Sequence, residues 1–292
     1  MAVFYFFLGK GGVGKSTISA VQALQETARG KKVLLISMDP AHNQADIFDR
    51  PLTDKPTSIQ SRLEVLQMDH SYWIKKYLQQ IESRLKSSYQ YLSALNLDHY
   101  LQIIRFSPGI EEYALLLAFD YYARTYAQKD LLIFDMPPTA LTLKFFNLPQ
   151  LSILWLEKLL QLRREILEKR KIISKIKLGR VESETDKILN NLNKQMGLYS
   201  AINERLHDPA QTKLKLVLND DRLSRSETRF IVDRLQEWKY AIDEWLVNNV
   251  QGGIKAADIN APESQTRFYP RAAEPLIGVP ALERYLATMT GR

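Results

Sequence analysis

A glycine-rich segment near the N-terminus holds the residues best suited to chemistry. Gly9 to Ser16 match the spacing G-x-x-x-x-G-K-[ST] between an apolar run and a helical pattern. Glycines let backbone N–H groups converge on phosphate oxygens, and the following helix adds its positive N-terminal end. We therefore predict an ATP site. The expected nucleotide-contacting residues in it are Gly9, Lys10, Gly11, Gly12, Val13, Gly14, Lys15, Ser16 and Thr17.

Within this loop the residue types indicate separate roles. Lys15 is expected to bridge the β- and γ-phosphates, Ser16 to ligate Mg²⁺, and Thr17 to reach the α-phosphate. Asp135 ends the apolar run 131–134, where a buried strand is expected. A carboxylate there can hold Mg²⁺ directly or through water. The predicted metal-holding residues are Ser16 and Asp135.

The elements that must position these residues alternate between strands and helices. Apolar runs at 3–8, 33–36, 131–134, 214–218 and 244–247 indicate buried strands, and 17–29 has helical spacing. Such alternation predicts a doubly wound, mostly parallel α/β sheet of the P-loop type, with its chemistry at the C-terminal ends of the strands.

Two long stretches break this rhythm with helical periodicity. Residues 72–101 form one, and 151–206 hold at least two more helices, separated near Gly179. We predict a single ATPase domain over 1–292, with a helical subdomain from insertions at about 70–105 and 146–212. The apolar stripes are expected mostly to pack internally, although a leucine-rich surface that binds apolar helices is an alternative. One stripe carries Leu151, Trp155, Leu159, Leu162, Ile166, Ile173 and Ile176.

Composition excludes some chemistry and leaves other partners open. The sequence has no cysteine, which excludes disulfides, thiolate-bound metal and cysteine-bound arsenite. The net charge of +7 is concentrated between Lys158 and Arg180, where nine basic residues accompany two acidic ones. This segment is a solvated helix face or a site for nucleic acid, acidic lipid or an acidic partner. A cytoplasmic location is expected, with an organelle stroma as the alternative.

The loop sequence resembles a known class of ATPases. G-K-G-G-V-G-K-S-T is similar to the deviant Walker A motif of partition, septum-placement and nitrogenase-reductase ATPases. In that class the early lysine neutralises phosphate charge across a dimer interface. The resemblance implies this role for Lys10 and implies a homodimer.

The segment after the second predicted strand resembles one family within that class. Asp39–Asn43 reads D-P-A-H-N, similar to the first switch of the arsenite-pump ATPase family, whose eukaryotic relatives deliver tail-anchored membrane proteins. The resemblance implies that Asp39 polarises the attacking water and that His42 and Asn43 belong to a nucleotide-sensing loop. The expected catalytic residues are thus Asp39, Lys10 and Lys15. An ordinary loop with a helix-capping aspartate is the alternative for Asp39.

Further segments resemble the same family, with departures. Asp135–Leu143 resembles its second switch, D-T-A-P-T-G-H-T-L, but Ala140–Leu141 replace the Gly-His pair. This departure leaves the Mg²⁺ role of Asp135 intact. It puts in doubt the coupling of this switch to distant helices that is usual in the family. Residues 107–112 resemble its P-G-I-D-E segment. Asn248 is similar to its adenine-reading asparagine, and Pro275–Leu276 lie where a loop closes over the base.

Taken together, the resemblance implies Mg-dependent ATP hydrolysis that switches a dimer to bind or deliver an apolar client, or a membrane-associated partner. The chain lacks the C-x-x-C clamp and the methionine-rich groove of the targeting relatives. One alternative is a positioning ATPase that binds DNA or membrane through the basic segment. The large helical insertion argues against it, so DNA is not expected. A nucleotide-switched regulator without an apolar client is the other alternative.

Overall fold

The computed structural model of the chain describes residues 2–41, 43–88, 107, 109–178, 186–251, 255–259 and 261–290. It divides the chain into two compact units. The sheet unit comprises Met1–His70, Leu115–Phe146 and Leu206–Arg292, and the helical unit comprises Ser71–Ala114 and Asn147–Arg205. In the part that is described, no helix is long and apolar enough to cross a membrane.

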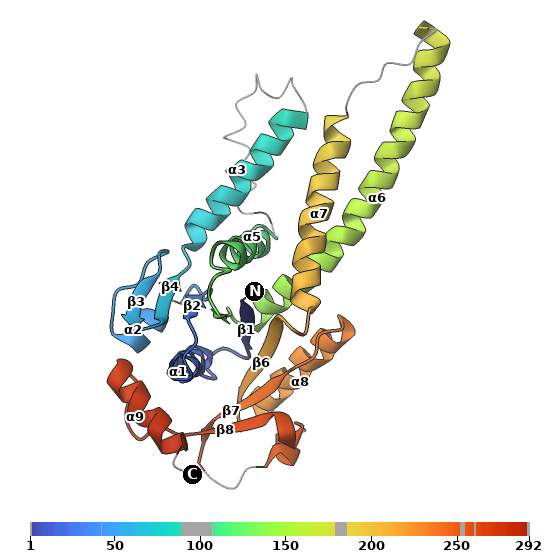
Figure 1. Ribbon diagram of the computed structural model, residues 1–292. Helices are drawn as coiled ribbons and strands as arrows, with labels where there is room; N and C mark the ends of the chain where they lie inside the picture. Colours follow the sequence, from blue (N-terminus) through green and yellow to red (C-terminus); the bar gives the residue numbers. More distant parts are fainter. Residues whose placement is uncertain are drawn as a thin grey trace. The chain divides into compact units, whose positions relative to one another are not determined.

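An eight-stranded sheet forms the centre of the sheet unit (Figure 1). The strand order is β3-β4-β2-β5-β1-β6-β7-β8, and only the β3–β4 pair is antiparallel. The predicted doubly wound, mostly parallel α/β fold is therefore confirmed. The strands are β1 (Val3–Leu8), β2 (Val33–Ser37), β3 (Thr57–Gln60), β4 (Leu63–Gln67), β5 (Leu131–Asp135), β6 (Thr212–Asn219), β7 (Glu244–Val250) and β8 (Thr266–Pro270).

The helices follow the strands along the chain. They are α1 (Lys15–Ala28), α2 (Asn43–Phe48), α3 (His70–Ser88), α5 (Ile110–Thr125), α6 (Thr139–Leu178), α7 (Lys187–His207), α8 (Arg222–Glu237) and α9 (Val279–Thr290), with short 3₁₀ turns η2 (Ala256–Ile259) and η3 (Glu263–Gln265). The helix predicted over 72–101 is confirmed as far as Ser88. Its continuation lies outside the described residues, as do Gly179 and residues 182–185 of the predicted separator.

Both faces of the sheet are buried, which explains the continuous apolar runs of its strands. Because side chains alternate along a strand, Phe4 and Phe6 of β1 point to one side, where Phe6 stacks on Phe134 and contacts Phe146 at the start of α6. Phe7 enters the opposite core, which contains apolar residues of α1, β2, β5 and α9.

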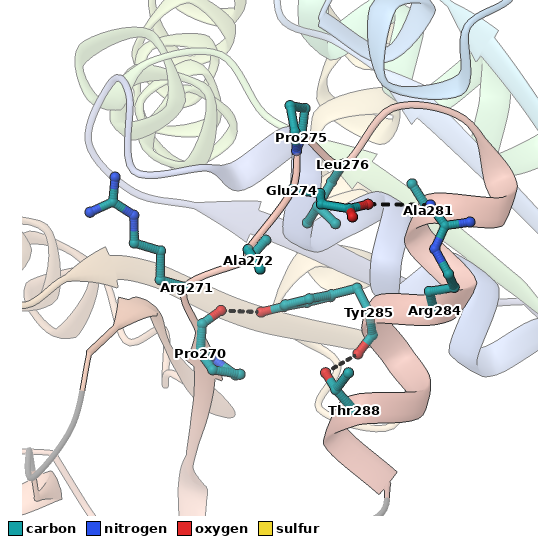
Figure 2. Close-up of a pocket in the computed structure, with 11 residues that line it drawn as sticks. Pro270, Arg271, Ala272, Glu274, Pro275, Leu276, Ala281, Arg284, Tyr285 and Thr288 are labelled. Atoms are coloured by element: carbon teal, nitrogen blue, oxygen red, sulfur yellow. Dashed lines mark hydrogen bonds and ion pairs between the residues drawn. The ribbon is translucent and has the colours of Figure 1, made fainter.

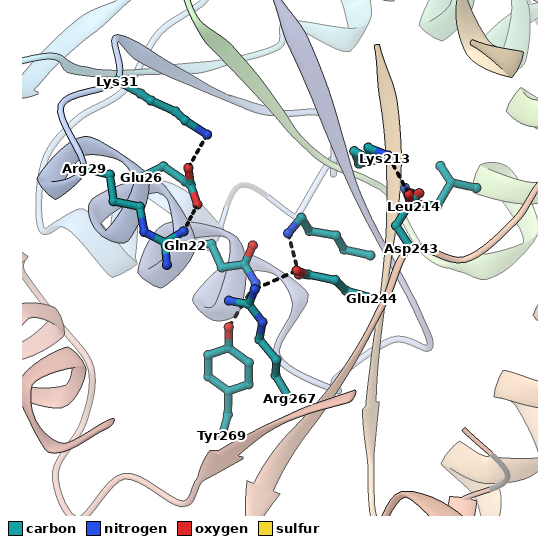
Figure 3. Close-up of polar contacts among 11 residues, drawn as sticks. Gln22, Glu26, Arg29, Lys31, Lys213, Leu214, Asp243, Glu244, Arg267 and Tyr269 are labelled. Atoms are coloured by element: carbon teal, nitrogen blue, oxygen red, sulfur yellow. Dashed lines mark hydrogen bonds and ion pairs between the residues drawn. The ribbon is translucent and has the colours of Figure 1, made fainter. Parts of the chain in front are cut away.

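Charged side chains also enter the sheet unit on the α1 side (Figure 3). The buried Lys215 ammonium lies 2.5 Å from Glu244, which also pairs with Arg267 at 2.9 Å. Burial lowers the pKa of Lys215, and Glu244 opposes that shift. In the second half of α1, Glu26 pairs with two cations, and Gln22 donates to the Tyr269 hydroxyl at 2.9 Å. These opposite charges satisfy one another, so we regard the network as structural.

The helical unit has its own aromatic and leucine core. Tyr77 of α3 stacks on Tyr113 of α5, and Tyr113 contacts Tyr199 of α7. Leu156 and Leu160 of α6 are buried, and Arg163 pairs with Asp186, just before α7, at 2.6 Å.

The opposite face of α6 is exposed, contrary to the expectation of internal packing. At helical spacing, residues 151, 155, 162 and 166 lie about 100–160° around the helix axis from the mean direction of residues 156 and 160. The described residues leave this outer side uncovered. Six apolar residues on it are exposed: Leu151, Leu154, Trp155, Leu162, Ile166 and Ile172. We call these six the α6 apolar stripe.

Candidate functional site

The glycine-rich loop joins β1 to α1, as the motif requires. Two of its glycines are demanded by geometry. Gly9 has φ +144°, and a Cβ there would lie 2.2 Å from the carbonyl oxygen of Val217. Gly14 has φ +89°, and a Cβ would lie 2.3 Å from Nδ2 of Asn248. Glycine at these two positions therefore lets the loop adopt this conformation and pack closely against β6 and β7.

Lys15 begins α1 and folds back over the loop. Its ammonium donates to the carbonyl oxygen of Lys10 at 3.2 Å, and the residue is only 5% exposed. Burial lowers the pKa of Lys15, while the carboxylates of Asp135, Asp39 and Glu227 favour its charged form. A desolvated ammonium that forms no ion pair with the residues the structure describes is suited to receive phosphate oxygens.

Asp135 lies at the end of β5, in register with Ser37 of β2 and Phe7 of β1. Burial raises the pKa of this carboxyl to about 6, although the Gln44 amide, the Ser16 hydroxyl and the Lys15 ammonium each lower it. Its Oδ2 accepts from Gln44, whereas its Oδ1 is buried with no hydrogen-bond partner among the described residues. A buried carboxylate oxygen left over beside a serine hydroxyl fits the oxygen ligands that Mg²⁺ prefers.

Asp39 follows β2 and is nearly buried. Its Oδ1 accepts from the backbone N–H of Ala41 at 2.9 Å, which closes a tight turn in the predicted first switch. His42 of this loop lies outside the described residues, and Asn43 begins α2. The carboxylate thus stands at the same sheet edge as Asp135, and its role toward water stays a prediction.

The remaining predicted contacts surround this edge. Lys10 is half-buried within the loop. Asn248, near the end of β7, is buried against the loop and donates through Nδ2 to the carbonyl oxygen of Val13 at 2.9 Å. The structure therefore shows Asn248 supporting the glycine-rich loop, a contact that the sequence did not suggest. Its adenine-reading role is untested.

Pro275 and Leu276 lie between β8 and α9, where they line a pocket of about 350 Å³ (Figure 2). Tyr285 of α9 closes one side and donates to the carbonyl oxygen of Pro270 at 2.7 Å. The N–H of Gly278 in this loop donates to the carbonyl oxygen of Ile47 at 2.8 Å, which ties the loop to α2. We call α2, which begins at the end of the predicted first switch, the switch helix. No described contact joins this pocket to the glycine-rich loop, so base binding by these two residues stays a prediction.

Sequence reasoning missed two polar residues of the site. Gln44 of α2 contacts Asp135, and Glu227 of α8 accepts from the Thr139 hydroxyl at 2.5 Å, at the start of α6. Gln44 directly follows the predicted switch sequence, and Glu227 lies within a polar helix. No local sequence motif marks either residue as part of a nucleotide site. The contacts join residues 91 and 88 positions apart.

A phosphate loop between β1 and α1 of a parallel sheet, with aspartates at the ends of β2 and β5, defines the class of P-loop nucleoside triphosphatases. Residues 2–263 match the family described as anion-transporting ATPase, and the chain belongs to that family.

Individual relatives agree with this assignment. The chain is 28% identical over 258 residues to a protein of Aquifex aeolicus (strain VF5) named as an arsenical pump-driving ATPase, covering 84% of this chain and 62% of the relative. It is also 28% identical over 247 residues to the ATPase ASNA1 homolog of Cryptosporidium parvum (strain Iowa II), covering 84% of this chain and 64% of that protein. The chain therefore spans less than two thirds of the length of these two relatives.

Proposed function

We propose that this chain hydrolyses Mg-ATP at the loop between β1 and α1. The observation that carries the proposal is the convergence of one buried ammonium and two carboxylates: Lys15 interacts electrostatically with both Asp135 and Asp39. Family membership supports the same activity.

We assign each residue the role that its chemical type and the family resemblance imply. Lys15 binds the β- and γ-phosphate oxygens, and the backbone N–H groups of the loop receive the remaining phosphate charge. Ser16 and Asp135 would hold Mg²⁺, which when bound neutralises charge on the phosphates. Asp39 orients the attacking water through its carboxylate. Asn248, Pro275 and Leu276 contact the base.

We further propose a homodimer in which Lys10 reaches the nucleotide of the partner subunit. Its support is the lysine early in the loop, at a position that an ordinary phosphate loop does not require. A cation delivered by a partner would link hydrolysis to assembly, as an arginine finger does.

A second function, binding of an apolar client segment, is favoured by the α6 apolar stripe. Single exposed apolar residues are normal on a protein surface, but this helix carries six large ones. A group of this kind is typical of an interaction site. Helix α6 begins four residues after Asp135, so nucleotide state can reach it through Thr139. Relatives are named for arsenical pumps. With no cysteine, this chain is proposed to act without thiolate capture of arsenite. The cytoplasmic location stays a prediction.

The test of the hydrolytic site is the Asp39→Asn variant. Asparagine retains the acceptor that holds the Ala41 turn but cannot activate water as a carboxylate does. Phosphate release should fall by roughly 10²–10⁴-fold while Mg-ATP affinity is kept. Asp46→Asn, on an exposed residue of the same segment, is the matched control and should hydrolyse normally. Wild-type turnover by Asp39→Asn would show that the assignment is wrong.

A further inference from the structure

Gln44 is a fully buried amide in the middle of the candidate metal site. Its Nε2 lies 3.0 Å from the carbonyl oxygen of Ser16, 3.0 Å from Oγ of Ser19, and 2.9 Å from Oδ2 of Asp135. The Gln44 side chain thus connects three elements: the switch helix α2, the first turns of α1, and the end of β5.

The orientation of the amide follows from these partners. Oδ2 of Asp135 and the carbonyl oxygen of Ser16 are acceptors, and the Ser19 hydroxyl already donates to Ser16. An amide oxygen in this place would face acceptors only, so the nitrogen must occupy it. The Oε1 atom on the other side is buried with no hydrogen-bond partner in the described part of the chain. Leaving such an atom unpaired is costly, which indicates that the N–H contacts matter.

Gln44 also distinguishes the two oxygens of Asp135. Its amide engages Oδ2, and Oδ1 remains the carboxylate atom without a partner among the described residues. A carboxylate held through one oxygen cannot rotate freely, so its other oxygen keeps a fixed direction. This is the way in which residues behind metal ligands orient them.

We propose that Gln44 is a positioning residue that presents Oδ1 of Asp135 to Mg²⁺ and ties the switch helix α2 to the metal. The inference rests on the proposed function, because it assumes that Mg²⁺ binds with the nucleotide at this loop. It adds a residue that acts through Asp135 and contacts neither water nor phosphate itself.

The test measures Mg²⁺ binding without any hydrolysis. A fluorescent ADP analogue is titrated onto the full chain in EDTA and at increasing Mg²⁺, for wild type, Gln44→Leu and Gln44→Asn. Leucine removes the donor, and asparagine keeps the amide but is one methylene too short to reach Asp135. Gln22→Leu is the matched control, since Gln22 is also buried but lies about 9 Å along α1 from Ser16 and bonds to Tyr269.

The Mg²⁺ concentration at half-effect should rise about 10–100-fold in Gln44→Leu, and should rise in Gln44→Asn as well, because metal affinity depends on such supporting contacts. Affinity in EDTA should match wild type, which a general loss of structure would not allow. Either folded Gln44 variant with the wild-type Mg²⁺ midpoint overturns the inference, as does an equal shift in Gln22→Leu. Wild type with no Mg²⁺ effect on nucleotide affinity would instead contradict the proposed function.

Discussion

The sheet unit and the helical unit depart from ordinary burial in opposite directions. In the sheet unit, charged groups such as Lys15 and Asp135 are buried in the candidate nucleotide site. In the helical unit, large apolar groups such as Trp155, 65% exposed, and Leu162, 53% exposed, face outward. Each departure costs folding free energy or solubility. The residues least explained by stability therefore mark the surfaces proposed to bind ATP and an apolar client.

The largest expected effect separates the two faces of α6. Leu160→Ala should cost about 2–5 kcal/mol in the free energy of unfolding, because Leu160 is 6% exposed and its loss leaves a cavity. Leu162→Ala should change stability by less than about 0.5 kcal/mol. Urea unfolding followed by circular dichroism compares the two variants.

Substitutions at Leu162 also test the proposal that α6 binds an apolar client. Leu162→Ser should weaken capture of an apolar helical peptide while leaving stability unchanged. Equal destabilisation by both alanine variants would show that the outer face is covered in the folded protein. Unchanged peptide capture with Leu162→Ser would favour a regulator without an apolar client, and salt-sensitive binding to DNA or anionic vesicles would favour a positioning ATPase.

A somewhat smaller effect is expected in the sheet unit, with the opposite sign. Because burial raises the pKa of Asp135 to about 6, its charge opposes folding at neutral pH. Asp135→Asn should stabilise the nucleotide-free chain at pH 7 by up to about 3 kcal/mol, since each pKa unit corresponds to about 1.36 kcal/mol. The variant should also lose the Mg²⁺ dependence of nucleotide binding.

The pH dependence of the stability difference between wild type and Asp135→Asn shows whether the charge of Asp135 causes it. The pKa of Asp135 is 3.8 in the unfolded state and about 6 in the folded state. Between these pH values the Asp135 carboxyl is protonated more fully in the native state than in the unfolded state. Wild type therefore loses this contribution to stability as pH rises through the window, and the advantage of Asp135→Asn grows. Urea unfolding at several pH values measures it. A gap that does not vary between pH 4 and 7 would assign the effect to packing and not to charge.

Strands that a local run of apolar residues marks could be predicted from the sequence. The bounds of β1 match the apolar run 3–8, and β2 and β5 match theirs within a residue, because strands buried on both faces leave continuous apolar runs. The strands β3, β4 and β8 were missed. They are short and carry polar residues, such as Ser58 and Arg267, which hide the signal of a strand near the sheet edge.

Contacts between distant segments were beyond the sequence. The phosphate loop is a local motif, so Lys15 and Ser16 were found at once. Gln44 was not, since its role depends on Asp135, which lies 91 residues away. Likewise, the apolar spacing of α6 was visible, but which of its faces is buried depends on segments that fold against it from elsewhere in the chain. Periodicity locates a stripe without telling what covers it.

The most direct test of the account is Mg-dependent phosphate release from ATP by the wild-type chain and by Lys15→Ala. Lys15 interacts with both carboxylates of the site, and its burial disfavours its own charge, so its removal should leave the fold intact while the phosphates lose their main cation. We predict turnover in wild type that disappears with EDTA, and loss of both turnover and ATP affinity in Lys15→Ala. Wild type without turnover under any Mg²⁺ condition, or Lys15→Ala with wild-type turnover, would contradict the account.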